Sequence, residues 1–106
     1  MEIKITDNNF DAEVKESSMP VLVDFYADWC VPCKMMAPLV AQLAEAYEGK
    51  CKIGKCDTGE NPGLVGEYRI MSIPTFIFFK GGKAVETVMG AVPKNELEAK
   101  IKQVLA

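Results

Sequence analysis

The feature of the sequence that most constrains its fold is the run VLVDFYA at residues 21–27. All but one of these residues are apolar, and several are β-branched or aromatic. Such a run is typical of a strand in the middle of a sheet with both faces covered. The motif WCVPC follows at residues 29–33, and a helical pattern of apolar residues extends over about 32–49. A buried strand therefore passes directly into a long helix.

The rest of the chain alternates strand and helix patterns. The clearest is a hairpin over residues 75–90, because Gly81 and Gly82 accept the positive φ that a tight turn demands. Further strands are expected at residues 2–5 and 51–57. Further helices are expected at residues 6–17 with Thr6 or Asp7 as the cap, at 60–70 with Asn61 as the cap and Pro62 in the first turn, and at 94–105. The order βαβαβαββα predicts an α/β fold with a mixed sheet and helices on both faces.

Length and charge narrow the function classes. The chain of 106 residues fits one domain, residues 1–106, and its net charge of −3 argues against a nucleic acid or an anionic membrane surface as partner. No apolar run is long enough to span a bilayer, and no export signal is visible, so we expect a cytoplasmic location. Thiols stay reduced there, and a Cys-x-x-Cys pair is then more often catalytic or metal-binding than a structural disulfide.

The four cysteines differ in what they can do. The spacing of Cys30, Cys33, Cys51 and Cys56 is close to that of a zinc site with four thiolates. Cys51 and Cys56, however, have opposite parity in their predicted strand and therefore point to opposite faces. A disulfide between them is also excluded, because five strand steps separate their Cα atoms by about 16 Å. We expect no metal, and we interpret both residues as small apolar core side chains.

Cys30 and Cys33 lie where the buried strand meets the helix. The unpaired N–H groups of a helix N-terminus favour a negative charge and can lower the pKa of a thiol, whose thiolate is the nucleophile. Pro32 suits the first turn, and it disfavours helical backbone at Val31, so the helix is expected to begin at the proline. The pattern predicts an exposed attacking sulfur, Cys30, and a shielded resolving sulfur, Cys33.

The chain resembles the thioredoxin family over essentially its whole length. The matching segments are VDFYADWC and PCK around the cysteines, Pro38 in the following helix, KCDTGENPGLVGEYRI at residues 55–70, SIPTFIFFKGGK at 72–83 and MGA at 89–91. The resemblance implies the thioredoxin fold, a central mixed five-stranded β-sheet flanked on both faces by four α-helices. Pro38 is expected to kink its helix over the sheet.

The resemblance also implies an activity, that of a protein-disulfide reductase. Cys30 would attack a disulfide of a protein substrate, and Cys33 would then attack Cys30, release the reduced substrate and leave a Cys30–Cys33 disulfide. The protein would bind no cofactor itself. Electrons would come from a thioredoxin reductase that uses flavin and NADPH, or from a ferredoxin-linked one, and a monomer is expected.

Asp24 stands inside the apolar run, where a carboxylate is costly to bury. One interpretation is an edge strand with Asp24 in water. The other, which the resemblance favours, is a buried acid beneath Cys33 that accepts or donates its proton near neutral pH. Lys55 matches a lysine of the family that could pair with this acid, although it could equally be an ordinary surface lysine.

Pro74 matches a family proline whose peptide bond is cis and which faces the cysteine pair, although most Ile-Pro bonds are trans. A substrate peptide would then bind there partly as an added strand. Residues expected to form a flat, weakly apolar patch around the sulfur are Trp29, Ile73, Pro74, Gly90 and Ala91. Trp29 could instead be a core side chain.

Val31 is the main departure, because the commonest motif of the family has glycine there. Valine is stiff at χ1 and adds apolar bulk beside Cys30, so Val31 and Pro32 are expected to tune the redox potential. Other functions stay open: an oxidase or isomerase of the same fold, a glutaredoxin-like enzyme, or a binding module. The chain contains no histidine of the kind often found between the cysteines of an oxidase. A glutaredoxin usually has Pro-Tyr in place of Val-Pro.

Overall fold

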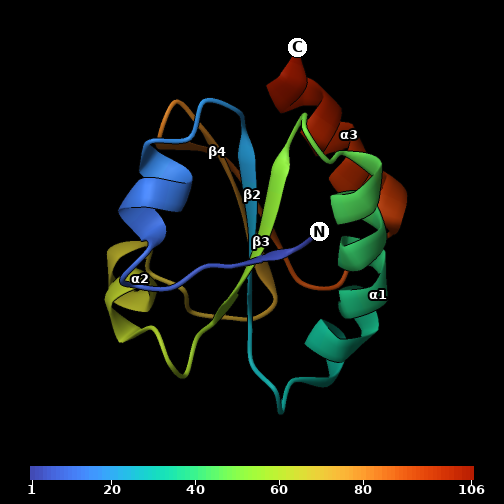
Figure 1. The fold of residues 1–106 in the computed structure, drawn as a ribbon. Coiled ribbons are helices and arrows are strands. Elements are labelled where there is room, and N and C mark those ends of the chain that lie inside the picture. Colours follow the sequence, from blue (N-terminus) through green and yellow to red (C-terminus); the bar gives the residue numbers. More distant parts are fainter.

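The computed structural model describes all 106 residues and shows one five-stranded sheet with helices on both faces (Figure 1). The elements in chain order are β1 (Ile3–Lys4), η1 (Asp11–Lys15), β2 (Val21–Tyr26), α1 (Val31–Ala46), β3 (Lys52–Asp57), α2 (Pro62–Glu67), β4 (Thr75–Lys80), β5 (Lys83–Met89) and α3 (Lys94–Leu105). The predicted order of elements and the mixed sheet are confirmed. No helix is both long enough and apolar enough to cross a bilayer.

The apolar run forms β2, the central strand of the sheet. The strand order is β1-β3-β2-β4-β5; β2 is parallel to β3 and antiparallel to β4. In this register Asp24 lies between Lys55 of β3 and Phe76 of β4. The alternative of an edge strand with a solvated Asp24 is therefore wrong, since Asp24 has a strand on each side and is 5% exposed.

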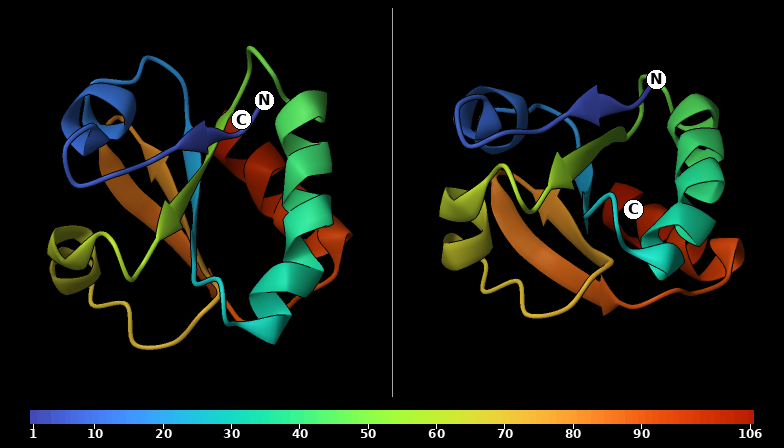
Figure 2. Two further views of the ribbon diagram at one scale, coloured as in Figure 1. Left: turned by 60° about the horizontal axis from the view of Figure 1, so that its bottom comes forward. Right: turned by 90° about the horizontal axis from the view of Figure 1, so that it is seen from below.

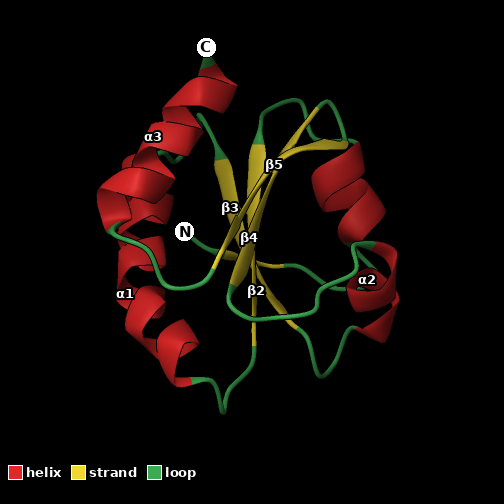
Figure 3. Ribbon diagram, turned by 180° about the vertical axis from the view of Figure 1, so that it is seen from behind, coloured by secondary structure: helices red, strands yellow, loops and turns green.

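Two separate hydrophobic clusters form the core, one on each face of β2. The helices α1 and α3 cover one face of the sheet, and η1 and α2 cover the other (Figures 2 and 3). The cluster under α1 and α3 includes Leu22, and the cluster under η1 and α2 includes Val23. Alternate residues of β2 thus serve opposite clusters, as the pleat requires. The same parity separates the two free cysteines, because Cys51 belongs to the first cluster and Cys56 to the second.

The first helix is the main correction to the predicted fold. The expected helix over 6–17 is a short π-helix, η1, which begins after Phe10 and has no side-chain cap. Asp7 caps a different helix: its carboxylate accepts hydrogen bonds from the backbone N–H groups of Gly63 and Leu64, 3.0 and 2.9 Å away, at the start of α2. The fourth helix of the predicted set is therefore one π-helical turn, and the sheet is flanked by three α-helices and this turn.

Smaller differences concern helix ends. Asn61 is the N-cap residue of α2, but its side chain makes no cap hydrogen bond and instead accepts one from the N–H of Asp7, 2.8 Å away. The helix α1 begins at Val31, one residue before the predicted start, because N–H groups of a first turn need no helical partner and Pro32 fits the second position. The Gly81–Gly82 turn is confirmed, with φ of +62° and +79°.

Candidate active site

The two cysteines of WCVPC lie at the N-terminus of α1, at the lower end of the molecule in Figure 1. Cys30 and Cys33 form a disulfide, and their Cα atoms are 5.2 Å apart. Cys30 is the N-cap residue, with extended backbone, and the helix continues through Pro38 to Ala46. The predicted strand-to-helix junction is therefore where the sulfur pair lies.

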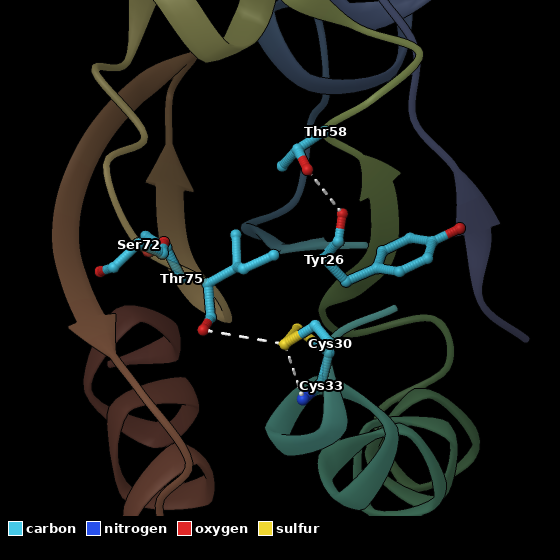
Figure 4. The surroundings of a disulfide bond; sticks show 7 residues. Tyr26, Cys30, Cys33, Thr58, Ser72 and Thr75 are labelled. Atoms are coloured by element: carbon cyan, nitrogen blue, oxygen red, sulfur yellow. Dashed lines mark hydrogen bonds between the residues drawn. A yellow bond between two sulfur atoms is a disulfide. The ribbon is translucent and has the colours of Figure 1, made fainter. Parts of the chain in front are cut away.

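The helix N-terminus acts directly on the sulfur of Cys30. The backbone N–H of Cys33 donates a hydrogen bond to this sulfur, 3.2 Å away, as the dashed line in Figure 4 shows. Pro32 removes an N–H from the first turn at no cost, since that group would have no helical acceptor. A negative charge on this sulfur would be stabilised by both the hydrogen bond and the helix dipole.

The burial of Cys30 differs from the prediction. Cys30 and Cys33 are both 4% exposed, so the expectation of an exposed Cys30 is wrong for the disulfide form. The loop before β4 contributes to this burial, because the carbonyl oxygen of Ile73 lies 3.9 Å from the sulfur of Cys30. The exposed groups beside the disulfide are Trp29, at 78%, and Val31, at 64%. Trp29 is therefore not a core side chain.

The loop that covers Cys30 is fixed from both sides. The Ile73–Pro74 peptide bond is cis, as the resemblance implied. The hydroxyl of Thr75 donates to the carbonyl of Ser72, 2.6 Å away, and the N–H of Gly90 donates to the carbonyl of Pro74, 2.8 Å away. The structure thus brings Ile73 and Pro74 next to the disulfide and ties Gly90 to the same loop.

A surface groove begins at Trp29 and Ile73 and runs along the loop before Pro74. Its volume is about 320 Å³. The other lining residues come from the segment after β3, from the C-terminal part of α2 and from the loop that follows: Thr58, Gly59, Val65, Ile70, Met71 and Ser72. Met71 is 91% exposed. Gly90 and Ala91 do not line this groove.

A second cavity, of about 180 Å³, opens behind Cys33. Asp24 and Cys33 both line it, together with Lys55 and Glu2. The predicted acid and the predicted resolving cysteine therefore share one space. Lys55 is exposed and forms no ion pair within 4.0 Å of a carboxylate.

Asp24 is the unusual ionisable group of this cavity. Burial raises its pKa to about 7, the charge of Glu2 adds to the rise, and the positive charge of Lys55 opposes it. The Oδ1 atom of Asp24 has no hydrogen-bond partner in the protein. A carboxyl group with these properties can exchange a proton near neutral pH.

Glu2 is one of the charged cavity residues that sequence reasoning missed, with Asp28 and Lys34. It was assigned only to the first strand, because the order β1-β3-β2 that brings it near Asp24 cannot be read from the local pattern. The sequence signal that could have found Glu2 is the alternation of side chains between the two faces of a strand. By this alternation Glu2, just before β1, lies on the same side of the sheet as Lys4, while Ile3 packs into the cluster on the other face.

The two other cysteines take no part in the site. Both are buried, on opposite faces of the sheet, which confirms that they cannot hold one ion together. Burial raises the pKa of the Cys51 thiol to about 11 and that of Cys56 to about 12. Neither is a nucleophile at neutral pH.

Comparison with known proteins agrees with this geometry. The model of the family "Thioredoxin" matches residues 1–103. The chain is 53% identical to "Thioredoxin 1" of Nostoc sp. (strain PCC 7120) over 94 residues, 89% of this chain and 88% of the relative. It is 51% identical to "Thioredoxin" of Chlorobaculum thiosulfatiphilum over 96 residues, 91% and 89% of the two chains. It is also 45% identical to "Thioredoxin M-type, chloroplastic" of Spinacia oleracea, over 96% of this chain and 56% of the relative. The chain belongs to the thioredoxin family of thiol–disulfide oxidoreductases.

Proposed function

We propose that this protein is a general protein-disulfide reductase, a cytoplasmic monomer that receives electrons from a thioredoxin reductase using flavin and NADPH. The observation that carries the proposal is the hydrogen bond from the N–H of Cys33 to the sulfur of Cys30 at the start of α1. It supports a thiolate at Cys30 in the reduced protein.

The first step is attack by the Cys30 thiolate on one sulfur of the substrate disulfide. A bond forms between Cys30 and that sulfur, the substrate disulfide breaks, and the other substrate sulfur leaves as a thiolate. The exposed side chains of Trp29 and Val31 flank the attacking sulfur. Together with Ile73, Pro74 and the segment Gly90–Ala91 they would hold the substrate chain, with main-chain hydrogen bonds at the loop before β4.

The second step uses Cys33 and the cavity behind it. The thiol of Cys33 passes its proton to the carboxylate of Asp24, directly or through a water molecule in the shared cavity. The Cys33 thiolate attacks the sulfur of Cys30, the Cys30–Cys33 disulfide forms, and the second substrate sulfur leaves as a thiolate. The two electrons of the dithiol have then passed to the substrate, and the reductase restores them.

The insulin-reduction assay with dithiothreitol tests the assignment of the two sulfurs. Wild-type protein should accelerate the precipitation of reduced insulin. Cys30→Ser should abolish the acceleration, and Cys33→Ser should remain joined to substrate as a mixed disulfide that mass spectrometry detects. Trapping by Cys30→Ser in place of Cys33→Ser would reverse the assigned roles and overturn the proposal.

The role of Asp24 needs a separate measurement. Asp24→Asn should slow the Cys33 step while the fold stays intact, since the amide cannot take up a proton. Stopped-flow reduction kinetics of the wild type between pH 6 and 9 should show an inflection near pH 7, and Asp24→Asn should lose it. Superimposable profiles for the two proteins would exclude Asp24 as the proton acceptor.

A further inference from the structure

The cavity behind Cys33 contains a second acid that the reaction described above does not use. Glu2 lines this cavity with Asp24, Cys33 and Lys55, although it lies more than twenty residues away from Asp24 in the sequence. Glu2 is partly buried, and burial raises its pKa, while Lys55 and the amino group of Met1 oppose the rise. The reaction described above gives this partly buried carboxylate no role, although it lines the cavity through which Cys33 would pass its proton to Asp24.

Strand pairing places Glu2 there. β1 is parallel to β3, with Ile3 opposite Gly54 and Lys4 opposite Lys55. Because Ile3 points into the cluster under η1 and α2, its neighbour Glu2 points to the α1 face of the sheet. Lys55 and Asp24 are register partners on that same face.

Three carboxylates, Glu2, Asp24 and Asp28, and two cations, Lys34 and Lys55, line this space. The charged or titratable groups around Asp24 come from every element packed there: Glu2 just before β1, Tyr26 of β2, Asp28 of the following loop, Cys33 and Lys34 of α1, Lys55 of β3 and the Met1 amino group. β4 contributes Phe76, which carries no charge. Met1 already pairs with Glu48, 3.1 Å away. Lys55 is the cation whose charge lowers the pKa of both Glu2 and Asp24.

We propose that Glu2 is a positioning residue for disulfide exchange: its negative charge at the cavity that Asp24 shares with Cys33, only partly offset by the ammonium of Lys55, makes Asp24 a stronger proton acceptor for Cys33. The inference rests on the proposed role of Asp24. With Glu2 ionised, the ionised form of Asp24 is repelled by a neighbouring negative charge and only partly compensated by Lys55. Asp24 then holds the proton taken from Cys33 more firmly.

The first test is the titration of Asp24 in the oxidised protein, followed by the carboxyl ¹³C chemical shift. Glu2→Gln should lower the midpoint of Asp24 by about half a pH unit, the size expected when one neighbouring charge is removed across a partly hydrated cavity. Glu2→Asp should restore most of the wild-type midpoint. The difference between wild type and Glu2→Gln should shrink in 1 M NaCl, because screening weakens a charge effect and not a structural one.

Glu45→Gln is the matched control. Glu45 is an exposed acid of α1 that lines the neighbouring surface groove with Glu2 but does not line the cavity of Asp24. Its substitution removes the same charge and should leave the Asp24 midpoint unchanged. An unchanged midpoint in Glu2→Gln, or an equal shift in Glu45→Gln, would overturn the proposal.

The second test links the titration to the reaction. The pH profile of the Cys33 step should move to lower pH in Glu2→Gln by the same interval as the Asp24 midpoint. In an Asp24→Asn background, Glu2→Gln should have no further effect on that profile. If the Asp24 midpoint moves and the pH profile of the Cys33 step does not, the role of Glu2 in disulfide exchange is overturned. Asp24→Asn by itself reports separately whether Asp24 acts in the reaction at all.

Discussion

Replacement of Asp24 by asparagine should stabilise the protein, and should do so in a pH-dependent way. Burial raises the pKa of Asp24 from its ordinary value of 3.8 to about 7. The folded state therefore keeps this proton up to about pH 7, while the unfolded state releases it near pH 4. As the pH rises through this window, ionisation stabilises the unfolded state alone, and the free energy of unfolding of the wild type falls. Asparagine has a similar shape and cannot ionise.

The size of the effect follows from the difference of about 3 between the two pKa values. Each pKa unit corresponds to about 1.4 kcal/mol, so the ionised Asp24 costs the folded state about 4 kcal/mol above pH 7. The advantage of Asp24→Asn should be under 1 kcal/mol at pH 4, should grow through pH 5 and 6, and should level off at about 4 kcal/mol near pH 8.

Urea unfolding of the oxidised proteins at each pH, followed by circular dichroism, measures this advantage. The informative quantity is the difference in free energy of unfolding between the two proteins, because it cancels the titration of every group that does not interact with Asp24. A difference that is constant between pH 4 and 8, or largest in acid, would refute the buried, proton-holding Asp24.

Two further predictions concern the turn and the free thiols. Gly82→Ala should destabilise the folded protein by about 2–3 kcal/mol, because φ is +79° there and an added Cβ would lie 2.7 Å from the carbonyl oxygen of Lys15. Gly81→Ala should destabilise it by only about 1 kcal/mol, because φ is +62° but no atom lies close to an added Cβ. Equal losses in urea unfolding would contradict this reasoning. In the oxidised protein Cys51 and Cys56 should not react with a thiol reagent at pH 8 until guanidinium unfolds the chain, since burial raises their pKa to about 11 and 12. Prompt labelling of both in the native protein would show that the core is open.

The sequence was most informative where the physical cause is local. The nearly continuous apolar run of residues 21–27, interrupted only by Asp24, predicts a central strand because only a doubly covered strand needs apolar side chains on both faces. Gly81 and Gly82 predict the hairpin because the positive φ of the turn depends on these two residues and not on distant contacts. The first helix is shorter than predicted, because Thr6 and Asn9 bond to each other in a turn before it and Asp7 forms its side-chain hydrogen bonds with α2, 56 and 57 residues along the chain.

The same distinction holds for the site. The position of Cys30 at a helix N-terminus could be predicted, since the junction lies within a few residues of sequence. The burial of the Cys30 sulfur beneath the carbonyl of Ile73 could not be predicted, because Ile73 belongs to a loop that lies near Cys30 only in the folded sheet. Glu2 was missed for a similar reason, as it reaches Asp24 across β3, which comes much later in the chain.

The most direct test of the account is the reactivity of the reduced protein towards iodoacetamide between pH 5 and 10, with peptide mapping of the modified cysteine. The helix N-terminus and the N–H of Cys33 should make Cys30 the residue alkylated first, with a rate midpoint well below the value of about 8.5 of an ordinary thiol. Cys33 should stay unmodified over the same period. Modification of Cys33 before Cys30, or a midpoint for Cys30 at 8.5 or above, would contradict the claim that the start of α1 prepares this sulfur for attack.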